Sequence, residues 1–124
     1  SAASDVYKRQ TWYNIIDELL SEVNGMNGVL SFEYIKACVA PIAKKYKVQE
    51  IYLFGSYARG EADENSDLDF LVYGGEDFKL VMILAIAEEL SEVFKKGIDA
   101  FEIREIKTDS EFYHNIMREK RLVA

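Results

Sequence analysis

Residues 54–60 read Phe-Gly-Ser-Tyr-Ala-Arg-Gly, and residues 66–72 read Ser-Asp-Leu-Asp-Phe-Leu-Val. Apolar residues typical of strands precede the first segment, so one predicted strand ends there. Similar residues make up much of the second segment, so another predicted strand begins there. Asp67 and Asp69 are two residues apart, and alternate residues of a strand project to the same face. Two carboxylates on one face repel each other and cost stability unless a cation lies between them. The pair therefore predicts a metal site at the start of the second strand.

Gly55 and Ser56 lie where the first of these strands is predicted to end. A glycine at such a turn lets the backbone approach a phosphate closely, and the N–H groups that follow can point at the anion. The Ser56 hydroxyl adds a donor, and Arg59 lies within reach of the same turn. We expect Arg59 either to contact phosphates or to hold the loop to the acidic strand. The spacing differs from that of a Walker A loop, which ends in Gly-Lys-Ser/Thr.

A third acidic residue, Asp99, lies between apolar residues in the segment Gly-Ile-Asp-Ala-Phe over 97–101. A predicted strand is an unusual place for an acid without a function. If this strand lies beside the second one, Asp99 would join the metal pair or act as a general base. Glu102 would face the other side of the same strand, so it is the weaker candidate.

The spacing of apolar residues predicts the remaining elements. Helices are expected over 12–23, 31–46, 78–96 and 109–121, strands over 48–54, 68–73 and 98–103, and a helical turn with a loop over 57–66. This order indicates an α+β (α/β-like) domain, with a small mixed sheet flanked by helices. The side chains expected to face inward include Trp12, Leu80, Leu84 and Phe112. Tyr52, Tyr57 and Tyr73 flank the predicted site, where base stacking and ordinary packing are both open.

The chain has 124 residues, 49% hydrophobic residues, one cysteine and a net charge of −7. This length and composition fit a single domain with a real core, which we place over 11–124. Residues 1–10 are polar and aperiodic, and 5–10 resemble the translation of a library-preparation adapter, so we interpret 1–10 as a non-native or disordered leader. One cysteine allows no internal disulfide and suits the cytoplasm. The longest apolar stretch, 80–87, is too short to span a membrane, and the negative charge argues against a nucleic-acid substrate.

Gly55-Ser56, ten intervening residues and then Asp67-x-Asp69 resemble the signature of the polymerase-beta-type nucleotidyltransferase superfamily. The wider strings Gly-Ser-Tyr-Ala-Arg-Gly and Ser-Asp-Leu-Asp-Phe-Leu-Val look like its minimal nucleotidyltransferase (MNT) branch. The resemblance covers residues 32–124, where the predicted elements follow the family's order. A lone Asp-x-Asp is a weak signal, whereas the combined motif is specific.

The resemblance implies a nucleotidyltransferase fold and an Mg²⁺-dependent enzyme that uses ATP, with two metal ions expected. Gly55 and Ser56 would hold the triphosphate, Asp67 and Asp69 would ligate Mg²⁺, and Asp99 would complete the acidic triad. An acceptor hydroxyl would attack the α-phosphorus, and pyrophosphate would leave. MNT proteins often serve as antitoxins that adenylylate a tyrosine of a HEPN ribonuclease toxin, so a HEPN-type partner is expected.

Two alternatives stay open beside this interpretation. The chain could neutralise its partner by contact alone, with little or no transfer, or it could modify a small molecule. Enzymes of the latter kind usually carry a further domain for the acceptor. A domain of this size has few residues with which to cover its site, so a partner chain or an oligomer is expected to complete it.

Overall fold

The computed structural model describes residues 9–12, 15 and 28–124. Most of the predicted leader and of the first predicted helix lies outside the described residues. Trp12, which the sequence places in the core, is 42% exposed. Within the described residues, no helix is both long and apolar enough to cross a lipid bilayer.

Four strands form one mixed sheet in the order β3-β2-β1-β4. The strands are β1 (Glu50–Phe54), β2 (Leu68–Tyr73), β3 (Ile98–Glu102) and β4 (Arg121–Leu122). β1 pairs antiparallel with both β2 and β4, whereas β2 pairs parallel with β3. The predicted mixed sheet is therefore confirmed, and its two central strands, β1 and β2, are those next to the Gly-Ser and Asp-x-Asp segments.

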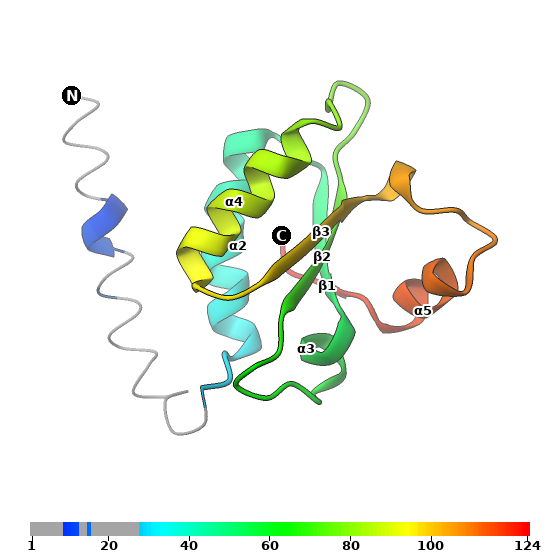
Figure 1. Cartoon of the computed structure of the whole chain (residues 1–124). Coiled ribbons are helices and arrows are strands. Elements are labelled where there is room, and N and C mark those ends of the chain that lie inside the picture. The colour runs from blue at the N-terminus through cyan, green and yellow to red at the C-terminus, as the bar shows by residue number, and fades with distance from the viewer. Residues whose placement is uncertain (1–8, 13–14, 16–27) are drawn as a thin grey trace.

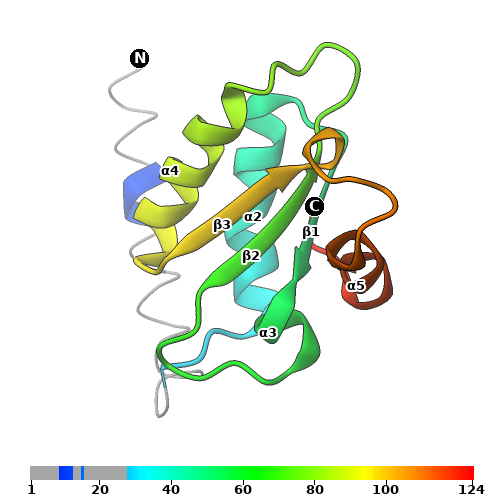
Figure 2. The same cartoon turned by 45° about the vertical axis from the view of Figure 1, so that its right-hand side comes forward.

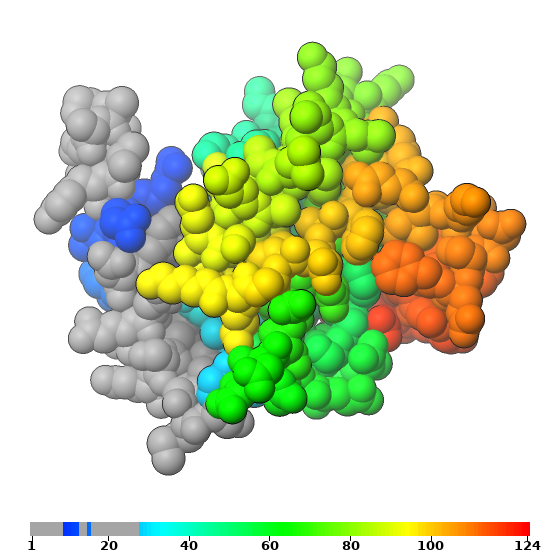
Figure 3. Space-filling view, in the orientation of Figure 1, coloured from blue at the N-terminus to red at the C-terminus, as the bar shows by residue number. Residues whose placement is uncertain are grey.

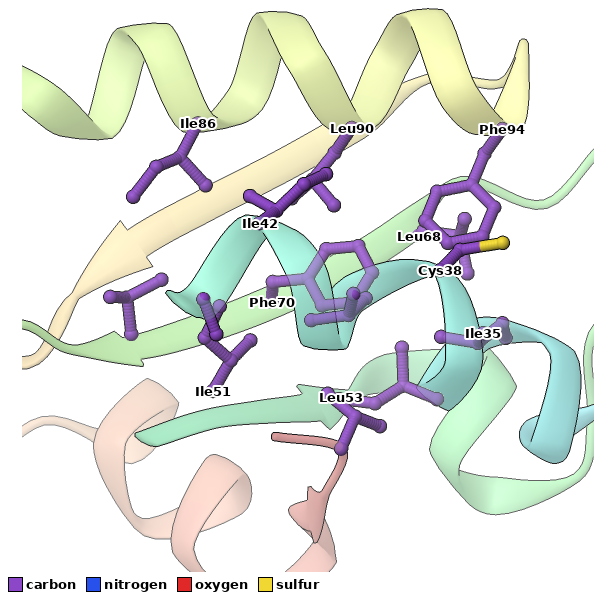
Figure 4. Close-up of a cluster of buried hydrophobic side chains, with 14 of the residues drawn as sticks. Ile35, Cys38, Ile42, Ile51, Leu53, Leu68, Phe70, Ile86, Leu90 and Phe94 are labelled. Atoms are coloured by element: carbon purple, nitrogen blue, oxygen red, sulfur yellow. The ribbon is translucent and has the colours of Figure 1, made fainter. Parts of the chain in front are cut away.

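Two helices, α2 (Phe32–Tyr46) and α4 (Met82–Phe94), cover one face of the sheet, and α5 (Glu111–Glu119) lies on the other (Figures 1 and 2). Figure 4 shows the core between α2, α4 and the sheet. Alternate strand residues point into it, and they include Ile51, Leu53, Leu68 and Phe70. The intervening strand residues point toward α5, because successive side chains of a strand alternate between faces. Asp69 and Asp99 belong to this second set.

Side-chain caps set the start of α2 and α5. Ser31 accepts a hydrogen bond from the Tyr34 N–H at the start of α2, and Ser110 accepts one from the Tyr113 N–H at the start of α5. Such caps satisfy N–H groups that have no partner within the helix. α2 runs through Pro41 to Tyr46 as one element, so the proline does not begin a new segment.

The helix expected over 78–96 is shorter than predicted, and two of its residues face outward. The chain turns at Phe78, whose ring packs so closely on Gly74 that a Cβ there would lie 2.2 Å from it. This contact ties Phe78 to the end of β2, and α4 begins only at Met82. Leu80 and Leu84, predicted to face inward, are 45% and 68% exposed.

The chain's last residues form a strand that the sequence did not predict. The helix expected over 109–121 ends at Glu119, and β4 follows it. The Ile51 N–H donates to the Ala124 carbonyl, and the Val123 N–H donates to the Ile51 carbonyl. β4 thereby pairs with the edge of β1 that β2 leaves free. Hydrogen bonds to β1 replace those that a longer α5 would have made.

The other differences are small. β1 begins at Glu50, later than the predicted 48, and β3 ends at Glu102, one residue early. The helical turn expected within 57–66 is a five-residue helix, α3 (Gly55–Arg59). Cys38, the single cysteine, is a buried side chain of α2.

Candidate active site

Gly55 begins α3 directly after β1, and its backbone has a φ of +74°. A Cβ added at Gly55 would lie 2.1 Å from Oδ2 of Asp69, which is far inside van der Waals contact. A glycine therefore serves two purposes at this position. It adopts the left-handed backbone without a steric cost, and it lets the β1–α3 turn lie directly against the carboxylate.

Asp69 and Asp99 face each other across the parallel pair of strands β2 and β3. Burial raises the pKa of Asp69, and a hydrogen bond with Asp99 and the charges of Asp99 and Asp67 raise it further. The charge of Arg59 acts in the opposite direction, and the resulting pKa of Asp69 is about 7 against an ordinary 3.8. The raised pKa means that Asp69 holds a proton more readily than an isolated aspartate does.

Asp67 lies just before β2 and is more exposed than Asp69. Its carboxylate rests on Gly97, where an added Cβ would lie 2.3 Å from Oδ1. Asp69 and Asp99 line a common pocket, whereas Asp67 lies outside the pocket lining. The three predicted acids are thus neighbours at one end of β2 and β3, but only two of them meet inside the pocket.

The donor chemistry of this corner suits a divalent cation. Carboxylate oxygens are the ligands that Mg²⁺ prefers, and two paired acids with a raised pKa gain from a positive charge between them. Among the described residues, no three His, Cys, Asp or Glu side chains are grouped closely enough to hold a metal ion. Asp69 and Asp99 therefore bring two carboxylates together in the pocket, whereas the Asp67 side chain lies outside the pocket lining.

Glu119, the last residue of α5, has contacts at this site that no sequence pattern indicated. Its Oε1 accepts a hydrogen bond of 3.0 Å from the Gly55 N–H, and its Oε2 accepts one of 3.0 Å from Nη1 of Arg59. Arg59 also donates from Nε to Glu61 at 3.0 Å. Arg59 thus holds its own loop and α5 together. Glu119 and Gly55 are 64 positions apart, and no local pattern links residues at that separation.

The pocket between α3, the sheet and α5 has a volume of about 540 Å³. Figure 3 shows the α3 segment in green beside the α5 segment in orange and red. Both polar and apolar residues line the pocket. They are Gly55, Ser56, Arg59, Asp69, Asp99, Asn115 and Glu119, together with Phe54, Phe101, Phe112 and Ile116.

The aromatic residues of this pocket are not the three tyrosines that the sequence suggested. Tyr57 is buried in the core beneath α2 and α4. Tyr52 and Tyr73 pack edge-to-face on each other at 5.5 Å, and neither lines the pocket. Phe112, expected to face the core, is instead 43% exposed at the pocket rim. Its ring lies edge-on to that of Phe101 at 5.5 Å.

Glu102 lies on the opposite face of β3 from Asp99, as predicted, and it is only 1% exposed. It accepts hydrogen bonds from the backbone N–H groups of Gly74 and Arg104 and from Nε of Arg104. These donors compensate the buried charge, which indicates a structural role. His114, the single histidine, is exposed on α5 beside Tyr113.

Comparison with known proteins agrees with this geometry. The sequence profile of the family described as "Polymerase beta, Nucleotidyltransferase" matches residues 38–124. A predicted protein adenylyltransferase of Methanocaldococcus jannaschii is 33% identical over 93 residues, which cover 72% of this chain and 93% of that protein. The protein adenylyltransferase MntA of Shewanella oneidensis is 32% identical over 62 residues, which cover 50% of this chain and 45% of MntA.

Solved structures show the same fold. A predicted minimal nucleotidyltransferase has a TM-score of 0.62 at 25% identity, over 74% of this chain and 95% of that one. A toxin–antitoxin structure with AMP-PNP also has a TM-score of 0.62, at 22% identity over 72% of each chain. The profile match includes the Gly-Ser turn and all three predicted acids. The chain belongs to the polymerase beta nucleotidyltransferase family.

Proposed function

We propose that this nucleotidyltransferase is an Mg²⁺-dependent adenylyltransferase that moves AMP from ATP to a tyrosine hydroxyl of a HEPN-type partner, and so acts as an antitoxin. The main support for the proposal is that Asp69, Asp99 and the turn at Gly55 line one pocket. Support also comes from relatives named protein adenylyltransferase. A neighbour of the same fold is a MNT antitoxin in complex with a tri-AMPylated HEPN toxin of S. oneidensis.

In the proposed reaction, the chain's own groups position the triphosphate and the acceptor. The N–H of Gly55, the Ser56 hydroxyl and the Arg59 guanidinium would bind phosphate oxygens. Mg²⁺, when bound by the acids, neutralises the charge that develops on the phosphate and leaving-group oxygens. Asp69 and Asp99, which line the pocket, would hold the metal together with Asp67, which lies just outside the pocket lining.

The acceptor's oxygen forms a bond to the α-phosphorus, and the bond from that phosphorus to the oxygen bridging to the β-phosphate breaks. Pyrophosphate leaves, and the acceptor's proton passes to the carboxylate of Asp99. Holding the two reactants in line supplies most of the rate enhancement in transfers of this kind.

Calorimetry with ATP tests the site. Native protein should bind ATP only in the presence of Mg²⁺, and the Asp67→Asn, Asp69→Asn double variant should lose this binding. A matched control is Glu76→Gln, Asp77→Asn, which removes the same charge from an exposed turn at the far end of β2. Metal-independent binding, or equal loss in the control, would contradict the assignment.

The acceptor is tested by co-expression with a HEPN-type protein. Mass spectrometry should find adenylyl groups on a tyrosine of that partner with the native chain and none with the double variant. Adenylylation of small molecules, and not of the partner, would support an enzyme that acts on a different class of substrate.

One observation favours a second candidate, neutralisation by contact alone. Two of the donors proposed for phosphate, the Gly55 N–H and Arg59, already hold Glu119. A binder without transfer would tolerate such a contact. Full neutralisation of the partner by the double variant would support this candidate over the enzyme.

A further inference from the structure

Glu119 holds two donors of α3 with its two carboxylate oxygens. Oε1 accepts from the Gly55 N–H and Oε2 from the Arg59 guanidinium, each at 3.0 Å. The Glu119 side chain is only 18% exposed, so little water competes for these bonds. Hydrogen bonds that involve an ionised group are roughly twice as strong as neutral ones. The Gly55 N–H and the Arg59 guanidinium therefore bind a carboxylate, and this carboxylate belongs to the chain itself.

The same two donors are those proposed above for the phosphates of ATP. A backbone N–H has one hydrogen, so the Gly55 N–H cannot serve Glu119 and a phosphate oxygen fully at the same time. The Glu119 carboxylate also lines the pocket that contains Asp69 and Asp99. Its negative charge repels a triphosphate at close range.

We infer that Glu119 is an internal competitor for the nucleotide's phosphates. It occupies the phosphate-binding donors when nucleotide is absent, and it leaves them when Mg²⁺ and ATP bind. Glu119 thereby sets the nucleotide affinity of the site. This inference rests on the proposed function, because it requires the same donors to hold the triphosphate.

The contacts around Glu119 allow the side chain to leave without unfolding α5. Ile116, one turn earlier, is 1% exposed and anchors the helix on the sheet. The residues that follow Glu119 pair with β1 through β4. Release therefore needs a rotation of one side chain at the end of the helix, and Arg59 keeps Glu61 as a second partner.

Glu61 provides a matched control for Glu119. Both carboxylates bind Arg59, and only Glu119 also binds the Gly55 N–H. The Glu61 side chain is 65% exposed, so solvent screens its ion pair with Arg59. Removing the charge of Glu61 tests the effect of the pairing with Arg59 alone.

The experiment compares native protein, Glu119→Gln, Glu119→Ala and Glu61→Gln by titration calorimetry with AMP-PNP and Mg²⁺. Glu119→Ala should bind roughly ten-fold more tightly than native protein, because two charge-assisted hydrogen bonds no longer compete. Glu119→Gln preserves the shape of the side chain and should bind roughly three-fold more tightly. Glu61→Gln should change the affinity by less than about two-fold.

The amide resonance of Gly55 in a ¹H–¹⁵N spectrum gives a second measurement that does not depend on activity. It should move in Glu119→Ala without nucleotide, and it should move in native protein when AMP-PNP and Mg²⁺ are added. A dispersed spectrum shows that each variant is folded.

Unchanged or weaker binding by both Glu119 variants, while native protein binds, would overturn the inference and leave the proposed function intact. If native protein and both variants are folded and none of them binds nucleotide, the proposed function itself fails. If Glu119→Ala binds nucleotide and native protein binds it too weakly to measure, the result supports both the inference about Glu119 and the proposed function.

Discussion

Asp69 and Asp99 are register partners in a parallel pair of strands, and this places two carboxyl groups side by side. The pKa of Asp69 is about 7 because the group is partly buried and shares a hydrogen bond with Asp99. An isolated aspartate would ionise far below neutral pH. The folded chain therefore carries an unfavourable charge at the point where a metal ion is proposed to bind.

The raised pKa predicts how stability depends on pH in the absence of metal. Between its ordinary value of 3.8 and about 7, Asp69 binds its proton more tightly in the folded chain than in the unfolded chain. This contribution to the free energy of unfolding is fully present below about pH 4 and is lost as the pH rises through 7. We expect Asp69→Asn to raise the free energy of unfolding on the order of 1 kcal/mol at pH 8 and to leave it almost unchanged at pH 4.

Urea denaturation of both proteins in EDTA at the two pH values measures this difference. Asp63→Asn, in the exposed loop before β2, is the control for removal of one negative charge. An Asp69→Asn variant that is equally destabilised at both pH values would contradict a raised pKa.

A comparison of alanine variants at Gly55 and Gly60 distinguishes the effect of backbone strain from the effect of close contact with Asp69. Both have a positive φ, of +74° and +72°, and only Gly55 has the Asp69 carboxylate where a Cβ would stand. Gly60→Ala should cost about 1–2 kcal/mol from the left-handed backbone alone. Gly55→Ala should cost at least about 1 kcal/mol more and abolish Mg²⁺-dependent ATP binding, because Asp69 must move away.

Thermal unfolding and calorimetry of the two glycine variants measure these effects. Equal loss of stability with ATP binding retained in both would show that Gly55 is not held against Asp69.

α5 forms the side of the pocket opposite α3, and it contributes both aromatic surface and Glu119. A single fully buried residue, Ile116, attaches this helix to the sheet. The neighbouring strand residues Phe54 and Leu71 share its cluster with Ile106. This second core is much smaller than the one under α2 and α4, so we expect α5 to be the more easily loosened part of the site.

Ile116→Ala tests this dependence. Truncation of a buried isoleucine should lower the free energy of unfolding by about 2–4 kcal/mol and weaken nucleotide binding, because the pocket loses its α5 side. His114→Ala, exposed on the same helix, should change stability by less than about 0.5 kcal/mol. Urea denaturation measures the first effect and calorimetry the second. A loss of stability without weaker nucleotide binding would show that the position of α5 does not matter to the site.

The net charge of the sequence is −7, and three of its basic residues contact acidic or aromatic side chains. Lys45, in the last turn of α2, pairs with Glu89 of α4. The Lys120 ammonium lies 4.2 Å from the centre of the Tyr52 ring, and the Arg121 guanidinium lies 3.8 Å from that of Phe32. Binding of a nucleic-acid backbone normally uses a basic surface, so the expectation that nucleic acid is not the substrate stays a prediction.

The sequence by itself determined the features that depend on near neighbours. The apolar run of β2 was predicted with its observed bounds, and the end of β1 at Phe54 followed from the glycine after it. Ser31 marked the start of α2 correctly because an N-cap is a contact across three residues. The spacing of Gly55-Ser56 and Asp67-x-Asp69 was enough to indicate the family, since a motif of this kind is contained in one segment.

Only the tertiary structure decided which distant groups meet. Asp69 and Asp99 share a pocket because β2 and β3 pair in parallel in one particular register, and a shift of one residue would place Asp99 on the other face. Glu119, at the end of α5, reaches Gly55 where the helix stops two residues earlier than its sequence pattern suggests and the chain then pairs with β1. These contacts join residues that are 30 and 64 positions apart. Local periodicity carries no information at such separations, so packing of the complete chain is what assembles the site.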